Sequence, residues 1–161
     1  MRKLVISAIF PLFLAACAGW GQPPVAPGQS LAEVRQRLGQ PTNIYQDGDD
    51  TLLEYAHGPW GQTTWMARFG PDGRLRSYEQ VLTAQKFATV KLHRDTKATI
   101  LHTFGRPMMV THYYSVDGDV WLYRYKEQDV WNSTMAVEFD RQGVVQAMVN
   151  GPDEEMEMKR R

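Results

Sequence analysis

A short motif, an apolar residue followed by Gly, any residue and Pro, occurs twice in this chain. It is LGQP at Leu38–Pro41 and FGRP at Phe104–Pro107, 66 positions apart. Glycine adopts the left-handed conformation that ends many helices, and a proline soon after it prevents the helix from continuing. The motif therefore predicts two helices that end in the same way. Alanine at Gly39 or Gly105 is expected to destabilise the fold by about 1 kcal/mol or more.

The similarity between the two parts of the chain extends beyond this motif. Up to the motif, matching positions are 66 apart; after it they are 70 apart, because the second part has four extra residues around MMVTHYYS. The matches at the first offset are Ser30 with Thr96, Val34 with Ile100, and Leu38 with Phe104. Those at the second are Tyr55 with Tyr125, Phe69 with Phe139, Gly73 with Gly143, Leu75 with Val145, and two DGD sequences. Two copies of one supersecondary unit explain this pattern most simply.

The first copy begins with one predicted helix and the second copy with two. In SLAEVRQRL, Ser30 and Glu33 have the spacing of a capping box, in which each side chain accepts a hydrogen bond from a backbone N–H of the first turn. In TAQKFATVKL, Phe87 and Val90 lie at helical spacing after a cap at Thr83. This extra helix precedes the one that ends in the second motif.

Strands with alternating apolar residues follow the helices in both copies. The residues expected on the buried face are Leu53, Tyr55, Trp65, Ala67 and Phe69 in one copy and Trp121, Tyr123, Tyr125, Met135, Val137 and Phe139 in the other. The turns GPDG and DRQG each lead into a further strand. The sequence therefore predicts an α+β fold of two tandem units, each with one or two short helices packed on a three- or four-stranded antiparallel sheet.

The opposite face of each predicted central hairpin carries one acid and one base. At the offset of 70, Glu54 corresponds to Arg124, and Arg68 corresponds to Glu138. Because side chains on neighbouring antiparallel strands can face each other, we expect Glu54 to pair with Arg68 and Arg124 to pair with Glu138. Four unrelated surface charges are the alternative.

The N-terminal segment has the pattern of a secretory signal. Arg2 and Lys3 precede an apolar stretch, Leu4–Leu14, which at roughly 1.5 Å per residue is too short to span a hydrocarbon core about 30 Å thick. The stretch ends in LAAC, with the only cysteine of the chain, Cys17. LAAC resembles the lipobox of bacterial lipoproteins, which implies that Cys17 is acylated and becomes the first residue of the mature protein. An ordinary signal peptide with a chance cysteine is the alternative.

These features divide the chain into a signal peptide (1–16), a Gly- and Pro-rich tether (17–28), two units (29–82 and 83–150) and a charged, disordered tail (151–161). The chain has 18 basic and 18 acidic residues. Since no basic stripe is present, nucleic acid is not expected as a partner. A single cysteine excludes an intramolecular disulfide, so packing must stabilise the fold.

The segments PGQSLAEVRQRLGQP and VLTAQKFATVKLHRDTKATILHTFGRP, with the lipobox and the strand–turn–strand pattern, resemble the BamE (SmpA/OmlA) family of small outer-membrane lipoproteins. The resemblance covers about residues 28–150, as two tandem copies. It implies a lipid anchor at Cys17 on the periplasmic face of the outer membrane. By the same resemblance, Ala18 after the cysteine favours sorting of the lipoprotein to the outer membrane. It further implies a role in β-barrel assembly or envelope integrity, with barrel-assembly subunits or another envelope protein as partners.

Tandem units of this kind are also similar to the β-lactamase-inhibitor protein fold. That similarity implies a different function, in which a concave double sheet binds and inhibits a periplasmic enzyme.

No catalytic or metal-binding pattern appears in the sequence. The four histidines, His57, His93, His102 and His112, are scattered, and the DGD sequences lack the distal acidic ligand of a calcium loop. We therefore expect a protein that is not an enzyme and that uses no cofactor or metal. A hydrolase whose catalytic residues meet only in space is the less favoured alternative.

Trp60 and Trp131 are the candidate partner contacts. They lie in HGPWGQ and QDVWN, the segments that join the central strands of each copy, and tryptophan is enriched among interface anchors. The alternative for each is a lid that folds over its own sheet. Trp65 and Trp121, in the alternating pattern, are expected in the core.

Overall fold

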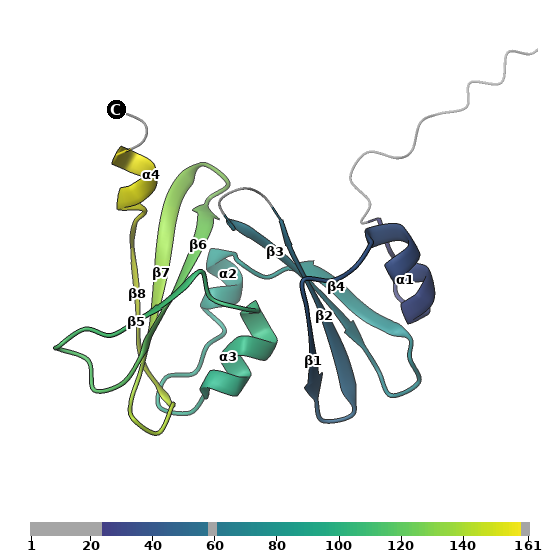
Figure 1. The fold of residues 1–161 in the computed structure, drawn as a ribbon, viewed down its shortest axis with the longest axis horizontal. Helices are drawn as coiled ribbons and strands as arrows, with labels where there is room; N and C mark the ends of the chain where they lie inside the picture. Colours follow the sequence, from purple (N-terminus) through teal and green to yellow (C-terminus); the bar gives the residue numbers. More distant parts are fainter. Residues whose placement is uncertain (1–23, 58–60, 159–161) are drawn as a thin grey trace, which may run out of the picture.

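The computed structural model describes residues 24–57 and 61–158. This part of the chain contains two four-stranded antiparallel sheets, each with its strands in sequence order (Figure 1). The first sheet is formed by β1 (Asn43–Asp47), β2 (Asp50–His57), β3 (Thr63–Phe69) and β4 (Leu75–Gln80). The second is formed by β5 (Met109–Thr111), β6 (Val120–Glu127), β7 (Trp131–Phe139) and β8 (Val145–Pro152).

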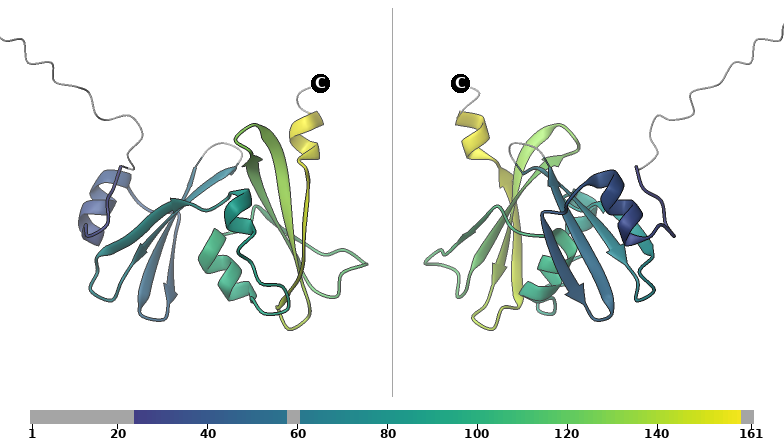
Figure 2. Two further views of the ribbon diagram at one scale, coloured as in Figure 1. Left: turned by 180° about the vertical axis from the view of Figure 1, so that it is seen from behind. Right: turned by 45° about the vertical axis from the view of Figure 1, so that its right-hand side comes forward.

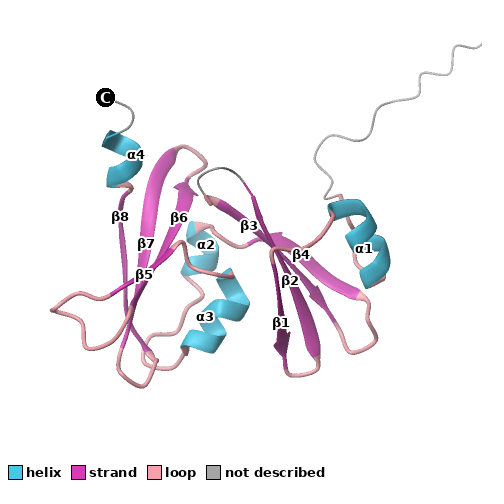
Figure 3. Cartoon of the chain, in the orientation of Figure 1, coloured by secondary structure: helices cyan, strands magenta, loops and turns pink. Residues whose placement is uncertain are grey.

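The helices are short: α1 (Leu31–Leu38), α2 (Ala84–Phe87), α3 (Lys97–Phe104) and α4 (Glu154–Met158). They occupy different layers of the molecule, as the cyan segments of Figure 3 show. α1 lies on one face of the first sheet, whereas α2 and α3 lie between the two sheets (Figure 2). The α+β class with antiparallel sheets that the sequence predicts is therefore confirmed.

Two apolar clusters hold these layers together. The smaller joins α1 to the first sheet through residues such as Val34, Leu53 and Phe69. The larger contains Leu52 from the first sheet together with Phe104 of α3 and residues of the second sheet. Because alternate residues of β2 point to opposite faces, its neighbours Leu52 and Leu53 enter different clusters. Both faces of the first sheet are thus buried.

The helix signals read from the sequence are present. The Ser30 hydroxyl accepts from the N–H of Glu33 at 3.3 Å, and the Glu33 carboxylate accepts from the N–H of Ser30 at 2.7 Å, which confirms the capping box. Gly39 and Gly105 have positive φ angles of 83° and 77°, as expected. Their ψ angles of −160° and −162° differ from the left-handed helical value, so that detail of the prediction is wrong. This mirror image of the extended conformation is essentially restricted to glycine.

Matching hydrogen bonds occur in the two sheets. The Tyr55 hydroxyl donates to the carbonyl of Gly39 at 3.5 Å, and the Tyr123 hydroxyl donates to the carbonyl of Gly105 at 3.1 Å. The two tyrosines that make this contact are 68 positions apart. Tyr123, and not Tyr125, is therefore the residue of the second sheet with the contact of Tyr55.

The predicted ion pair between Glu54 and Arg68 does not form. Leu52 is the residue opposite Arg68, so Glu54 lies two residues out of register. Arg68 instead binds the carboxylates of Asp47 and Asp50 at 2.9 and 3.0 Å, beside the turn between β1 and β2. The hydrogen bond and charge of Arg68 hold the pKa of Asp47 below its usual value.

The predicted pair of Arg124 with Glu138 does not form either, because these residues are four positions out of register across β6 and β7. The Arg124 Nε lies 2.7 Å from Asp153, and the guanidinium also binds Glu155. Both carboxylates belong to the segment from Gly151 onward, for which the sequence predicts a disordered tail, so that prediction is wrong for the described residues. The chain there instead continues β8 and forms α4, since the buried guanidinium of Arg124 binds both carboxylates.

Candidate functional site

The first sheet contacts the α3 segment at a buried carboxylate, Glu54, which is 1% exposed. Its Oε2 accepts hydrogen bonds from the Tyr45 hydroxyl, from the Asn43 amide at 3.0 Å and from the N–H of Arg106 at 3.3 Å. Burial, and then the hydrogen bond to this carboxylate, raise the pKa of Tyr45 well above its usual value, so the hydroxyl remains a donor in alkaline solution. Glu54 also packs against Gly105, where a Cβ would lie 2.7 Å from its Cδ.

Other contacts close the same junction. His102 of α3 lies 3.3 Å from Asp47, and Gln62 donates to the Asn132 side chain at 2.9 Å. The face of the first sheet that carries Glu54 is therefore covered by α2 and α3. The carboxylate of Glu54 joins the first sheet to the chain that follows α3, and so to the second sheet.

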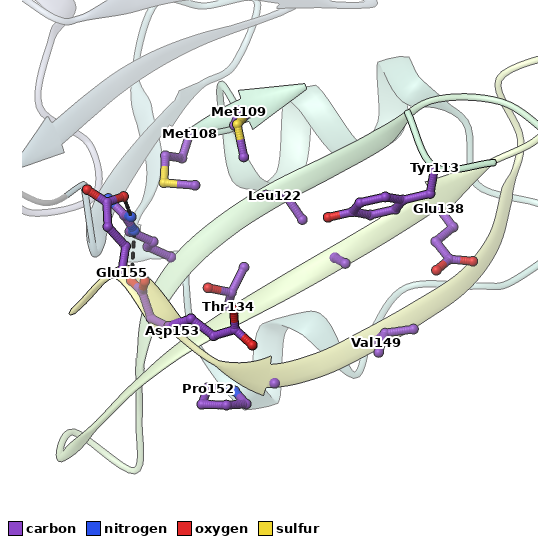
Figure 4. Close-up of a pocket in the computed structure, with 14 residues that line it drawn as sticks. Met108, Met109, Tyr113, Leu122, Thr134, Glu138, Val149, Pro152, Asp153 and Glu155 are labelled. Carbon is purple, nitrogen blue, oxygen red and sulfur yellow. Dashed lines mark hydrogen bonds and ion pairs between the residues drawn. The ribbon is translucent and has the colours of Figure 1, made fainter. Parts of the chain in front are cut away.

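The outer face of the second sheet, in contrast, is open and forms a groove of about 700 Å³ (Figure 4). Across its floor, Met109 lies opposite Leu122, Leu122 opposite Ala136, and Ala136 opposite Val149. These four side chains, one from each strand, lie side by side across the sheet, and we call them the apolar row. Figure 4 shows Tyr113 and the methionines on one side of the groove and Val149 on the other.

The groove has charged ends. The cluster of Arg124, Asp153 and Glu155 lies at one end, and Glu138 lies toward the other (Figure 4). Within the described part of the chain, Glu138 has no ion-pair partner. The arrangement suits the binding of an apolar surface that carries a positive charge.

Replacement of Arg124 tests what holds the C-terminal segment in place. Arg124→Met leaves the carboxylate of Asp153 buried without its cation, which is unfavourable. We expect amide hydrogen exchange of residues 153–158, followed by mass spectrometry, to accelerate about tenfold or more as α4 detaches. Arg141→Met is the control, since Arg141 and its partner Asp117 are exposed. Unchanged exchange in Arg124→Met would show that other contacts hold the segment.

Of the sequence-predicted site residues, Trp131 lies in the described part of the chain, and it does not line this groove. Cys17 and Trp60 lie outside the described residues. Trp131 begins β7 with 61% of its surface exposed, so it does not form a lid over its sheet. Trp65 and Trp121 are half-buried against the core, with Trp65 stacked on a tyrosine and Trp121 packed against a phenylalanine, in agreement with the predicted core positions.

One feature of the sequence indicates the groove. The positions between the buried aromatic residues of β6 and β7 include Leu122 and Ala136, whereas the cross-strand row of the first sheet includes Glu54. An apolar residue on the face that alternation assigns to solvent is such a feature.

Among residues 24–57 and 61–158, no group of three or more His, Cys, Asp or Glu side chains is placed to hold a metal ion. In the same residues, no helix is long and apolar enough to cross a membrane.

No known protein family and no curated protein matches this chain. A solved structure, that of the DUF4309 family protein YjgB from Bacillus subtilis subsp. subtilis str. 168, is similar with a TM-score of 0.34 and 9% sequence identity. The similarity covers 77% of this chain and 78% of that chain. Nothing about function follows from a likeness of this size.

Proposed function

We propose that this protein is a noncatalytic lipoprotein of the outer membrane that faces the periplasm and binds another envelope protein, in β-barrel assembly or envelope integrity. The observation that carries the binding role is the open groove on the second sheet, whose apolar row includes Met109 (48% exposed) and Val149 (52% exposed). A contiguous apolar surface with a polar rim is typical of a protein interaction site. The lipobox and the resemblance to the BamE family support the location and the pathway.

We also propose that the chain consists of two tandem copies of one unit. Isolated β-bridges at matching places support this, Ser30 with Arg74 and Thr96 with Val144. Matching backbone hydrogen bonds support it as well, from Thr42 to Glu54 and from Met108 to Leu122. This β-bridge and this hydrogen bond of the first part each have a counterpart between the equivalent residues of the second part. A duplication of one unit explains this agreement better than chance does.

The anchor gives the most direct prediction. Cys17→Ser removes the acylation site, and the protein is expected to move from the membrane fraction to the soluble fraction. Several acyl chains bind a bilayer stably, because each buried CH₂ contributes about 0.8 kcal/mol. Fractionation after a high-salt wash, followed by immunoblotting, measures the change. Retention of Cys17→Ser in the membrane would contradict the anchor.

Site-specific photo-crosslinking of the lipidated full chain in cells tests the binding role. A photoreactive residue at Val149, in the groove, is expected to form adducts with barrel-assembly subunits. The same residue at Asp49, in the exposed turn between β1 and β2, is the control. Absence of envelope-protein adducts from Val149 would contradict the proposed function. Adducts with a periplasmic enzyme, with stoichiometric loss of that enzyme's activity, would favour the inhibitor function instead.

A further inference from the structure

The first sheet shows how this fold covers the face that corresponds to the groove. Its row across the four strands is Asn43, Glu54, Met66 and Glu79, at the positions of Met109, Leu122, Ala136 and Val149 in the second sheet. α2, α3 and the chain that follows α3 cover the middle of the first row, where Glu54 and Met66 are buried (Figure 2). On the first sheet, short helices are thus the elements that pack on this face.

The charges at the covered face follow one rule, in which the sheet supplies acceptors and the helical segment supplies donors. Lys86 of α2 binds Glu79 at 2.8 Å. The N–H of Arg106, just after α3, donates to Glu54. Helices that dock on this sheet face therefore present positive or N–H groups to carboxylates.

The two rows differ most at three positions. Glu54 of the first row is 1% exposed, whereas the apolar Met109 and Val149 of the second row are 48% and 52% exposed. Burying a carboxylate costs free energy unless it is well hydrogen-bonded, and exposing an apolar row forgoes the hydrophobic contribution. The apolar row is therefore suited to a surface that lies on it.

The groove also has a definite charge. Four carboxylates line it, those of Glu138, Asp153, Glu154 and Glu155, against one guanidinium, that of Arg124. A basic ligand is favoured over an acidic one.

A second copy of this chain fits the groove less well. The exposed residues of α1, the helix on the outer face of the first sheet, are Ala32, Glu33, Gln36 and Arg37. This surface offers no apolar stripe to the apolar row, so the ligand is better sought in another protein.

We infer that the groove binds a short amphipathic helix of a partner protein, with the helix's apolar face on the apolar row and basic side chains toward Glu138 and α4. The inference rests on the proposed binding function and defines the class of partner. Met108 and Met109, which line one side of the groove, can adapt to helices of different sequence, since methionine side chains are flexible.

The test uses the full mature chain, Cys17–Arg161, produced without acylation, and a synthetic Leu/Lys amphipathic peptide of about four helical turns. A Leu/Glu peptide with the same apolar face is the matched probe of opposite charge. Calorimetric titration is expected to show saturable binding of the Leu/Lys peptide alone.

Two groove variants and two controls locate the binding. Ala136→Arg, in the centre of the apolar row, is expected to weaken binding at least about tenfold through steric and like-charge repulsion. Glu138→Gln is expected to weaken it about threefold. Ile44→Arg and Asp49→Asn make similar changes at exposed positions of the first sheet and should leave binding unchanged. Thermal unfolding of each variant confirms that it is folded.

Four results would overturn the inference. One is equal binding of both peptides, and another is binding of the Leu/Lys peptide that Ala136→Arg does not weaken. The third is a dimer in sedimentation that Ala136→Arg dissociates, which would assign the groove to a second copy. The fourth is that the Leu/Lys peptide does not bind although Val149 still forms crosslinks to envelope proteins in cells. That result would refute a helical ligand but would still support the proposed binding function.

Discussion

Glu54→Ala is expected to lower the free energy of unfolding by about 3 kcal/mol or more, because three donors lose their buried acceptor and a cavity remains. The donors are the Tyr45 hydroxyl, the Asn43 amide and the N–H of Arg106. Since the last of these belongs to the chain after α3, the loss also weakens the junction between the sheets. Urea-induced unfolding, followed by tryptophan fluorescence, measures the effect.

Glu79→Ala is the matched control for this prediction. Glu79 lies in the same cross-strand row and also has a helical partner, Lys86, but 46% of its side chain is exposed. An exposed ion pair contributes up to about 1 kcal/mol, so its removal should have a small effect. A loss in Glu54→Ala no larger than that in Glu79→Ala would show that the buried carboxylate does not stabilise the junction.

Gly105→Ala is expected to destabilise the fold by about 3 kcal/mol, whereas Gly39→Ala should cost about 1 kcal/mol. Both glycines have similar positive φ angles, so backbone strain is common to both. At Gly39 an added Cβ meets no atom within 4 Å. At Gly105 it would lie 2.7 Å from the Cδ of Glu54, whose hydrogen bonds prevent it from moving away.

A double-mutant cycle separates the two contributions. In the Glu54→Ala background the clash is absent, so Gly105→Ala should cost only as much as Gly39→Ala. The expected coupling is about 2 kcal/mol, within the range for residues in direct contact. Equal costs of Gly105→Ala in the two backgrounds would mean that strain alone explains the glycine.

The ordered C-terminal segment and the groove are two features that the sequence alone did not predict. The charged composition after Gly151 favours a disordered tail, and no local pattern indicates that Arg124 binds Asp153 and Glu155. These partners are about 30 positions apart in the chain and meet only because β6 and β8 belong to one sheet. The groove depends on the same contacts, since α4 forms one end of it.

The two glycine motifs, the Ser30 capping box and the alternation of apolar residues were sufficient to predict the helix ends, the α+β class and most buried positions. These features depend on residues within a few positions of one another, so local backbone and side-chain preferences determine them. The burial of Glu54, the partners of Arg124 and the open apolar row depend on strand register and on which helix covers which face. Only the tertiary structure decided them, because register and layer packing are set by contacts between residues far apart in the chain, which local preferences do not specify.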